Sequence, residues 1–554
     1  MCGIVGYVGK EQAAPFLLDG LSKLEYRGYD SSGIATFDGT NLIVEKCVGR
    51  LAALEEKIAG HVPQGHIGIG HTRWATHGRP ADNNAHPHTD GEGRFAVVHN
   101  GIIENYLPLK EELIKKGHTF KSETDTEVVA NLLAEVYEGD FEAAVHTVLN
   151  RIEGSYSLVF LSKEQPDRLI CAKKDNPLVI GLGKGENFIA SDIPAIISKT
   201  RKTYILNDGE VAVVRADGVE VRNLQGERVD KKVFEVNWNA EAAEKGGYEH
   251  FMLKEIHEQP KAIRDTMSQR IAKDGKTIVM EELKWDKDFL DSVNKIAVVA
   301  CGTAYHAGLV GKSYIEKLVR MPVEIDVASE FRYKEPIIDE KTLTIVVSQS
   351  GETSDTLAAL KEAGRRGSRT LAITNVVGSS IAREADQVIY TWAGPEIAVA
   401  STKAYTTQLV AFFMLALYMA EIMGTQPAER ITQLIDALRR LPDDVGRTFE
   451  DVDPLKTFAR QYGFNEDAFF IGRSLDYNVA MEGSLKLKEI SYIHAEAYAA
   501  GELKHGPLAL VDENMPIVVI APKDGLLDKV KANMQEVSAR GGELFVFTDL
   551  DSEY

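Results

Sequence analysis

Short apolar runs, separated by Gly-rich and polar turns, fill the first 240 residues. The runs with strand-like patterns predict β-strands at 2–9, 32–38, 66–73, 95–101, 156–163, 168–175, 178–183, 187–192 and 211–217. Apolar residues at helical spacing predict two longer helices, over 11–24 and 125–137. This pattern indicates an α+β domain rich in antiparallel strands.

The remainder of the chain alternates strands with helices and repeats itself. The strand–turn–helix unit at 295–308 matches 467–480, at a spacing of about 170 residues. The strands at 342–350 and 369–375 find partners at 515–523 and 542–549 with nearly the same spacing. Alternating strands and helices predict two parallel sheets with helices on both faces.

The two repeat units differ in length. The first continues through the strand QVIY and an apolar helix after residue 400, whereas the second reaches Tyr554 soon after its last matched strand. We therefore expect an incomplete second unit. The predicted domains are 2–238, a helical connector over 239–285, a first α/β unit over 286–430 and a second over 455–554.

Composition narrows the functional classes. A chain of 554 residues is longer than a single hydrophobic core usually organises, which predicts several domains. Its 44% hydrophobic and 26% charged residues are typical of a soluble globular protein. No apolar run approaches the roughly 20 residues of a membrane span, and a net charge of -20 argues against a general nucleic-acid binder. The four cysteines are too scattered for a disulfide framework or a CxxC metal site, which indicates a reducing, cytoplasmic setting.

Cys2 is a candidate nucleophile. Removal of Met1 would free an α-amine with a pKa of about 8, low enough to act as base for its own thiol. On position alone, a small buried cysteine is the simpler interpretation. Arg73 offers a fork suited to a carboxylate, and Asn100 and Gly101 at the end of a buried strand could form an oxyanion hole. Asp125 stands at a helix start, where an ordinary cap is the alternative.

The segments CGIVG, LEYRGYDSSG, HTRWATHG, HNGIIEN and SETDTE, in this order, resemble the N-terminal-nucleophile (class II) glutamine amidotransferases. The resemblance implies that Cys2 attacks the glutamine amide and that Asn100 and Gly101 stabilise the oxyanion. It also implies glutamine-binding and pocket residues, which are Arg73 for the α-carboxylate, Asp125 for the α-amino group, and Trp74, Thr76 and His77 around them, with Arg27 in support.

Histidines cluster in this domain, with seven of the 14 between His61 and His99. No HExxH motif or Cys/His pairing accompanies them. We interpret them as pocket and structural residues and expect no metal site.

The repeat half carries a candidate phosphate site. A buried strand ends in Ser348, Gln349 and Ser350, and a helix begins near Thr353. Hydroxyls and free N–H groups at a helix start, at the carboxyl end of a parallel strand, favour an anion over an ordinary cap. Thr303 and Ser401 occupy similar turns. Without a Walker A or GxGxxG motif, nucleotide binding is disfavoured.

These turns resemble the SIS (phosphosugar isomerase) domain. In the segment 482–510, Lys486 and Glu489 share a helix face. A surface ion pair is the simple interpretation, but His505 and further charged groups in an otherwise apolar stretch favour a site.

Together with SQSGET and ASTKAYTTQ, this segment resembles the family of isomerising glutamine–fructose-6-phosphate aminotransferases. The resemblance implies that ammonia from L-glutamine reaches D-fructose 6-phosphate internally and yields D-glucosamine 6-phosphate, the first step of hexosamine and UDP-GlcNAc synthesis. It further implies no cofactor and a cytoplasmic homodimer formed through the SIS domains. Glu489 would shuttle the proton between C1 and C2, Lys486 would aid it and His505 would assist ring opening. The phosphosugar would be bound by Thr303, Ser348, Gln349, Ser350, Thr353 and Ser401.

Two departures from the family pattern matter. Ala304 stands where the family often has Ser. The chain also lacks the family's C-terminal tail, whose Lys forms a Schiff base with the ketose, so we expect a truncated chain. The alternative function is therefore a glutaminase-active fragment whose SIS half binds sugar phosphate without synthase activity.

Other functions fit less well. An amidophosphoribosyltransferase would carry an acidic PRPP motif, and an asparagine synthetase an SGGxDS motif, and neither occurs. A sugar-phosphate sensor would leave Lys486, Glu489 and His505 unexplained.

Overall fold

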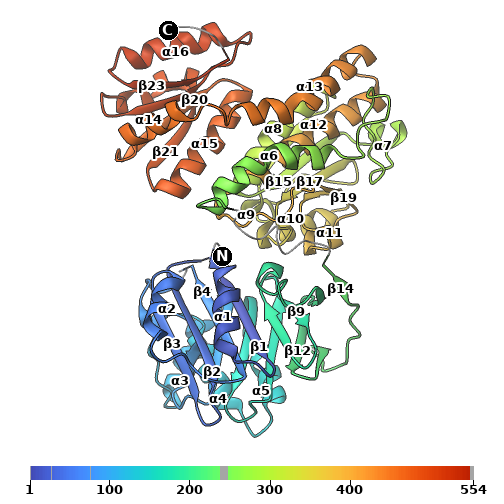
Figure 1. Ribbon diagram of the computed structural model, residues 1–554. Helices are drawn as coiled ribbons and strands as arrows, with labels where there is room; N and C mark the ends of the chain where they lie inside the picture. Colours follow the sequence, from blue (N-terminus) through green and yellow to red (C-terminus); the bar gives the residue numbers. More distant parts are fainter. Residues whose placement is uncertain (1, 26–27, 75–76, 237–246, 550–554) are drawn as a thin grey trace. The chain divides into compact units, whose positions relative to one another are not determined.

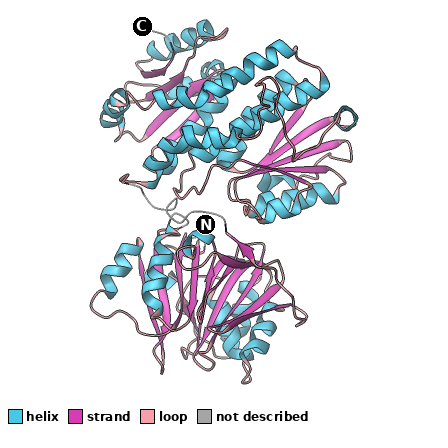
Figure 2. Cartoon of the chain, turned by 45° about the vertical axis from the view of Figure 1, so that its right-hand side comes forward, coloured by secondary structure: helices cyan, strands magenta, loops and turns pink. Residues whose placement is uncertain are grey.

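The computed structural model describes residues 2–25, 28–74, 77–236 and 247–549. The chain forms two compact units, residues 1–244 and 245–554, which are described separately below. Figure 1 traces the order of the elements, and Figure 2 separates helices from strands.

The first unit contains two antiparallel sheets. The eight-stranded sheet has the order β14 (Phe234–Glu235), β11 (Lys202–Ile205), β9 (Val179–Leu182), β10 (Asn187–Ala190), β1 (Gly3–Val8), β4 (Ile67–Arg73), β2 (Ser31–Phe37) and β3 (Leu42–Val48). The six-stranded sheet has the order β13 (Gly218–Asn223), β12 (Glu210–Arg215), β8 (Arg168–Lys174), β7 (Gly154–Ser162), β6 (Phe95–Ile103) and β5 (His88–Thr89).

Three apolar cores divide this unit into four layers. Helices α1 (Ala13–Ser22) and α2 (Leu51–Ile58) pack on the eight-stranded sheet. Helices α3 (Tyr106–Lys115), α4 (Glu127–Val136) and α5 (Phe141–Leu149) pack on the six-stranded sheet. The third core lies between the sheets.

The first four residues of strand β6, at 95–98, are all apolar because both faces of the strand are covered there. Phe95 and Val97 face the helices, whereas Ala96 and Val98 face the other sheet. Side chains alternate along a strand, so a strand covered on both faces needs apolar residues at every position.

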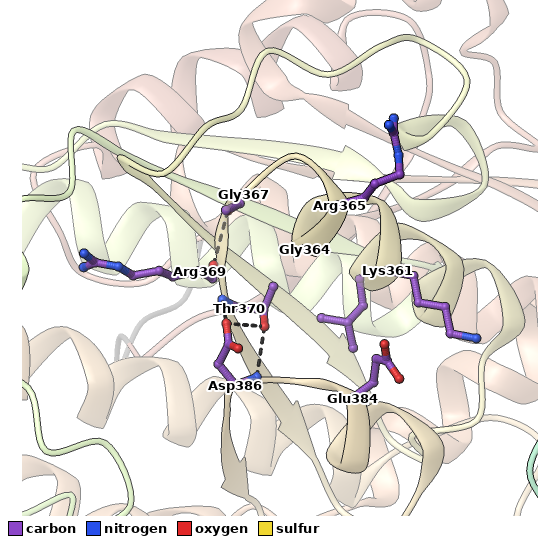
Figure 3. A pocket seen from close by; sticks show the side chains of 10 residues that line it. Lys361, Gly364, Arg365, Gly367, Arg369, Thr370, Glu384 and Asp386 are labelled. Atoms are coloured by element: carbon purple, nitrogen blue, oxygen red, sulfur yellow. Dashed lines mark hydrogen bonds between the residues drawn. The ribbon is translucent and has the colours of Figure 1, made fainter.

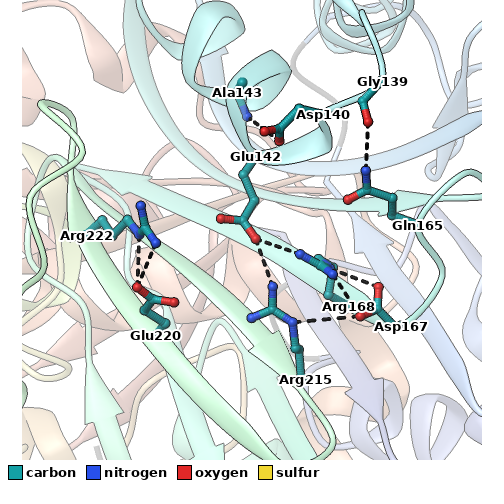
Figure 4. A network of polar contacts seen from close by, with 10 residues as sticks. All are labelled: Gly139, Asp140, Glu142, Ala143, Gln165, Asp167, Arg168, Arg215, Glu220 and Arg222. Carbon is teal, nitrogen blue, oxygen red and sulfur yellow. Dashed lines mark hydrogen bonds and ion pairs between the residues drawn. The ribbon is translucent and has the colours of Figure 1, made fainter.

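A surface network ties α5 to the six-stranded sheet (Figure 4). Glu142 Oε1 accepts hydrogen bonds from Arg168 Nη1 at 2.7 Å and from Arg215 Nη2 at 2.8 Å. Asp167 adds a two-pronged contact to Arg168. Two guanidinium groups on neighbouring strands thus share one helix carboxylate, which explains these charges without a ligand.

The second unit contains two parallel sheets. The first has the order β16 (Val323–Val327), β15 (Lys295–Ala300), β17 (Thr342–Ser348), β18 (Arg369–Thr374) and β19 (Gln387–Tyr390). The second has the order β21 (His494–Ala499), β20 (Asp467–Gly472), β22 (Pro516–Ile520) and β23 (Glu543–Phe547). The shared order and parallel pairing confirm the predicted repeat. Among the described residues, the second sheet has no counterpart of β19.

Helices cover both faces of the first parallel sheet. One face packs against α6 (Phe251–Met267), α8 (Gly302–Leu318), α12 (Lys403–Met423) and α13 (Ala428–Arg447). The other packs against α9 (Ala328–Phe331), α10 (Ser354–Arg365) and α11 (Ser380–Glu384).

The second parallel sheet has helices on both faces as well. Helix α16 (Leu527–Ser538) joins the core of Phe469 and Ile471. Helices α14 (Asp453–Tyr462) and α15 (Leu475–Ser491) contact the opposite side chains, and the ring of Phe458 on α14 lies tilted against that of Phe545, with centroids 4.2 Å apart.

Two expectations about apolar and connecting segments need correction. Helix α12 is, by length and composition, long and apolar enough to cross a membrane, although 61% of its most apolar window is buried inside the unit as a core helix. Among the described residues of the predicted connector, 247–285, only α6 is helical, and its Ile263 and Met267 belong to the core of the second unit. An irregular segment with an Ile271–Ile278 bridge follows, then the short helix α7 (Lys287–Asp291). The α+β and parallel-sheet predictions are otherwise confirmed.

The contact between α8 and α12 provides a test of packing. A Cβ on Gly311 of α8 would lie 2.5 Å from the Phe412 ring of α12. We expect Gly311→Ala to lower the free energy of unfolding of the second unit by about 1–2 kcal/mol, measured by urea denaturation. Gly364→Ala on α10, where a Cβ meets nothing within 4 Å, should instead raise it by about 0.5–1 kcal/mol. Equal effects of the two substitutions would contradict this packing.

Candidate active sites

Cys2 lies just before β1, beside the end of β4. The antiparallel pairing of Gly3 with Thr72 brings its thiol to Trp74, whose backbone N–H donates to Cys2 Sγ at 3.2 Å. Burial raises the pKa of the Cys2 thiol, an effect that the Trp74 hydrogen bond partly offsets. A thiol with a raised pKa needs a nearby base to act as a nucleophile.

Asn100 places its amide against the nucleophile. Its Nδ2 donates to the Cys2 carbonyl oxygen at 3.0 Å. Its Oδ1 lies 3.1 Å from His71 Nε2, which is also 3.0 Å from the His99 carbonyl oxygen. Both neighbours are acceptors, so His71 carries its proton on Nε2 and orients the Asn100 amide.

Gly101 follows within β6, which extends to Ile103 and so is longer than predicted. Its φ is +131°, and a Cβ there would lie 2.0 Å from the Ser155 carbonyl oxygen. Only glycine fits this position. The backbone beside Asn100 therefore carries no side chain at residue 101.

Arg73 ends β4 with its guanidinium buried, at 3% exposure. Nη2 donates to the carbonyl oxygens of His77 at 2.5 Å and Gly78 at 2.9 Å. Nη1 is buried without a hydrogen-bond partner among the described residues. An unpaired buried cation is costly, and a carboxylate ligand would satisfy it.

Asp125 joins the start of α4 to the end of β6. Its Oδ2 accepts from the Ile103 N–H at 2.8 Å and lies 4.0 Å from His99 Nδ1. Trp74 is 45% exposed and meets Tyr29 edge-on, and His77 meets Tyr106 in the same way. Thr76 and Arg27 lie outside the described residues.

Four of the clustered histidines form a buried group behind Asn100. These are His71, His86, His88 and His99. The rings of His71 and His86 are 4.1 Å apart, and those of His86 and His88 are 4.6 Å apart. Burial lowers the pKa of His71 to about 3 and lowers the pKa of the other three as well. In the part of the chain that the structure describes, no His, Cys, Asp and Glu group of metal-binding geometry occurs.

The predicted phosphate loop lies at the carboxyl end of β17. Ser348 Oγ is 2.9 Å from Thr353 Oγ1 and accepts from the Gly351 N–H at 3.0 Å. Ser350 Oγ accepts from the Glu352 N–H, and the Gln349 carbonyl oxygen accepts from the Asn375 N–H. The loop therefore holds its hydroxyls at the start of α10.

The neighbouring strand end supplies polar groups that the sequence analysis missed. Gly351 has φ +66°, and a Cβ there would lie 2.0 Å from Ser379 Oγ and 2.9 Å from Thr374 Oγ1. Both hydroxyls are buried without hydrogen-bond partners among the described residues. Neither stands in a recognisable motif, because the pairing of β17 with β18 brings Thr374 to the loop and Ser379 follows at the start of α11.

Ser401 is held by the carboxylate of Glu396, in the loop between β19 and α12. Its Oγ donates to Glu396 Oε2 at 2.6 Å. Glu255, buried on α6, accepts from the N–H groups of Ile397 at 2.5 Å and Ala398 at 3.2 Å. Burial, followed by the charge of Glu396, raises the pKa of Glu255 to about 7.

The structure joins Thr303, Lys486 and Glu489. Lys486 Nζ donates to Thr303 Oγ1 at 3.0 Å and lies 2.5 Å from Glu489 Oε2. Thr303 begins α8 and Lys486 lies on α15, so this contact links the two repeat units. His505 ends an exposed 3₁₀ turn, Ala500–His505, and no hydrogen bond or ion pair joins it to Lys486 or Glu489 in the described residues.

Ala304 belongs to the apolar core beneath α8 and is 9% exposed.

A cavity of about 510 Å³ lies elsewhere, where β18 and β19 begin (Figure 3). Asp386 there accepts from the N–H and hydroxyl of Thr370 at 2.8 and 2.9 Å. Because parallel sheets bind ligands at their carboxyl ends, this cavity at the amino ends is not the substrate site.

Comparison with known proteins matches both units to established families. The SIS domain family matches residues 289–418 and 465–553, and a glutamine amidotransferase domain family matches residues 71–198. The glutamine–fructose-6-phosphate aminotransferase [isomerizing] of Caldanaerobacter subterraneus subsp. tengcongensis is 58% identical over 99% of this chain and 90% of that protein. The chain belongs to the isomerising glutamine–fructose-6-phosphate aminotransferase family.

Two further members of this family extend the likeness. The relative of the same name from Clostridium tetani is 56% identical over 98% of this chain and 89% of that protein. The C-terminal domain of glucosamine-fructose-6-phosphate aminotransferase from Francisella tularensis is 44% identical, with a TM-score of 0.53, over 55% of this chain and 85% of that structure. The expected truncation is not supported by the match to the Caldanaerobacter relative. The predicted domain limits and residue roles stay predictions.

The buried histidines generate a pH prediction. An unfolded histidine takes up a proton below about pH 6.5, whereas these stay neutral in the fold, so the unfolded state binds more protons as the pH falls. We expect the free energy of unfolding of the first unit to fall between pH 7.5 and 5.5 by about 1 kcal/mol per buried histidine. Urea unfolding followed by hydrogen exchange of β4 and β6 measures it.

His86→Leu should weaken the pH dependence of the free energy of unfolding by the contribution of about one proton. The reason is that both ring nitrogens of His86 are buried without partners in the described residues. His61→Gln, at an exposed position, is the control and should leave the slope unchanged. A first unit that is equally stable at both pH values would refute the assignment.

Proposed function

We infer that this chain transfers the amide nitrogen of L-glutamine to D-fructose 6-phosphate and isomerises the product to D-glucosamine 6-phosphate, releasing L-glutamate. The observation that carries this inference is the presence of two sites on one chain. Cys2, Asn100 and Arg73 meet in the first unit, and the Ser348 loop and the Lys486–Glu489 pair lie in the second. The near full-length likeness to relatives of this name supports it.

In the first unit, Cys2 attacks the glutamine amide carbon. Its α-amine, freed by removal of Met1, takes the thiol proton and then passes it to the leaving ammonia. Asn100 Nδ2, which reaches the Cys2 carbonyl oxygen at 3.0 Å, and the Gly101 N–H stabilise the oxyanion. Water then hydrolyses the thioester to glutamate.

Substrate recognition in this unit rests on complementary charge. Arg73 binds the α-carboxylate through its buried Nη1, which has no partner in the described structure. Asp125, 4% exposed, binds the α-ammonium group. Trp74 and His77 line the pocket in this proposal, and the family motif assigns Thr76, which lies outside the described residues, to the same pocket.

In the second unit, the phosphate binds at the start of α10. Ser348, Gln349, Ser350 and Thr353 donate to it, and Thr303 and Ser401 hold the sugar. Ammonia adds to the C2 carbonyl and water leaves as the imine forms. Glu489 takes a proton from C1 and returns it to C2 while the proton of the C1 hydroxyl passes to the imine nitrogen, which leaves an amine at C2 and an aldehyde at C1. Lys486 assists near these carbons, and His505 assists ring opening.

Separate assays of glutamate and glucosamine 6-phosphate test this function. The unaltered chain with glutamine and fructose 6-phosphate should form both products in equal amounts. Cys2→Ala should abolish glutamate formation but retain amino-sugar formation from ammonium salts, because only the nucleophile is lost. Glu489→Gln should retain glutamate formation and abolish amino-sugar formation, because only the proton-shuttling carboxylate is lost. Cys47→Ala, at another buried cysteine, is the control and should change neither.

Each failure has a distinct meaning. Glutamate without amino sugar from the unaltered chain would leave a glutaminase whose SIS half lacks synthase activity. No glutamate, with loss of Met1 verified by mass spectrometry, would refute the role of Cys2.

We also propose that the chain acts as a homodimer through its SIS units, in the cytoplasm. The four cysteines are unpaired, as a reducing compartment requires. Large apolar side chains are exposed on the second unit, including Ile490 at 56% and Leu510 at 61%. Such exposure favours a protein interface.

The dimer is tested by sedimentation. We expect a mass of two chains at micromolar concentration, and Ile490→Glu together with Leu510→Glu should shift it towards one chain. Asp265→Asn on α6, at a charged surface position, should leave the mass unchanged. A single-chain mass at all concentrations would refute the dimer.

A further inference from the structure

Glu482 is a buried carboxylate at the junction of the two repeat units. It lies on α15 and is 5% exposed. Its Oε1 accepts from the Thr303 hydroxyl at 2.9 Å, and its Oε2 lies 2.8 Å from His306 Nδ1. Both partners stand in the first turns of α8, where the helix N-terminus favours a negative charge. These contacts keep a buried charge in place at low cost.

Glu482 shares the Lys486 ammonium with Glu489. Lys486 Nζ lies 3.4 Å from Glu482 Oε1, one turn earlier on α15, and 2.5 Å from Glu489 Oε2. It also donates to Thr303 Oγ1 at 3.0 Å. The ammonium thus faces three acceptors, one for each of its protons. Thr303 accepts from Lys486 and donates to Glu482, which closes a ring of contacts.

The spacing explains how one helix builds this arrangement. Residues 482, 486 and 489 lie four and three positions apart and so share one face of α15. Helix α12 adds Tyr405, whose hydroxyl is buried without a hydrogen-bond partner among the described residues. Burial, and then the charge of Glu482, raises the pKa of Tyr405. The carboxylate therefore faces groups from α8, α12 and its own helix.

We propose that Glu482, anchored by His306, is a positioning residue for the isomerisation, because it is a second carboxylate beside the Lys486 ammonium and Glu489 therefore does not hold that charge alone. This inference rests on the proposed function. If Glu482 were neutral, the only carboxylate left beside the ammonium in this network would be that of Glu489. A closed Lys486–Glu489 pair would hold the carboxylate that must move the proton between C1 and C2. Glu482 divides the cation between two anions and leaves Glu489 able to reach the sugar.

Steady-state kinetics with ammonium salts as nitrogen donor test the proposal. Glu482→Gln keeps the shape but removes the charge, and it should lower kcat for glucosamine 6-phosphate by at least about 30-fold with KM for fructose 6-phosphate within about threefold. Glutamate formation should be unchanged. Glu482→Asp, which restores the charge, should recover kcat to within about fivefold of the unaltered chain.

Asp265→Asn is the matched control. Asp265 pairs with Lys261 at the same four-residue spacing on α6, but both side chains are exposed. Its replacement should leave kcat and KM unchanged. Should Glu482→Gln fail to fold, His306→Phe removes the anchor while keeping the carboxylate, and a smaller loss of kcat at constant KM is then expected.

A chemical measurement separates this inference from the proposed function. Acetic anhydride labelling, quantified by mass spectrometry, should modify Lys486 at least about fivefold faster in Glu482→Gln, because the ammonium loses one of its two carboxylates. Lys312, paired with Glu316 on α8, serves as the internal reference. If the unaltered chain forms no amino sugar, the proposed function fails. The labelling rate of Lys486 still shows whether Glu482 acts on its ammonium.

Two results would overturn the inference. One is an unchanged Lys486 labelling rate together with an unchanged kcat in Glu482→Gln. The other is a loss of kcat accompanied by an equal loss of fructose 6-phosphate affinity and a lower melting temperature, since a purely structural role predicts that combination.

Discussion

Burial of both sheet faces is the constraint on which the rest of this structure depends. In the first unit and in the first parallel sheet, helices or a second sheet cover each face, so apolar side chains of the strands form the cores on both faces. Polar side chains can then meet a ligand chiefly where strands end. Cys2 before β1, Arg73 at the end of β4 and Ser348 at the end of β17 all occupy such places. The chemistry is concentrated at strand ends because the layers leave little other room.

Polar groups close to these strand ends are held in place by hydrogen-bond partners that are themselves buried. His71 orients the Asn100 amide because its Nε2 faces two acceptors, and His306 anchors Glu482. Arg73 Nη1 and Ser379 Oγ are buried without hydrogen-bond partners among the described residues, and an unsatisfied buried polar group is costly. A ligand would satisfy them, which is why both belong to the candidate sites.

The repeat gives the second unit an unequal pair of sheets. Both have the same strand order, yet the Ser- and Thr-rich loop occurs only after β17, whereas Ala521 and Pro522 follow β22. The second sheet contributes through α15 instead, which brings Lys486 and Glu489 to Thr303 of the first. Duplication of a fold has therefore produced one site from two different halves.

The sequence by itself determined the strand pattern, the repeat, the two families of motifs and most of the candidate residues. Local signals carried these features, because alternation, Gly turns and motif order are properties of neighbouring residues. It predicted an apolar helix after residue 400, but it did not reveal that residues between 263 and 285 join the second unit's core. That outcome depends on packing between segments far apart in the chain.

Only the tertiary structure decided how the candidate groups are held. The sequence analysis gave Glu482, His306 and Glu255 no role, and their contacts span 176, 179 or 142 positions of sequence. The pKa of Glu255 and those of the buried histidines shift because neighbouring layers exclude water from them. Desolvation and hydrogen bonding depend on what surrounds a side chain in space, and the order of residues along the chain does not contain that information directly.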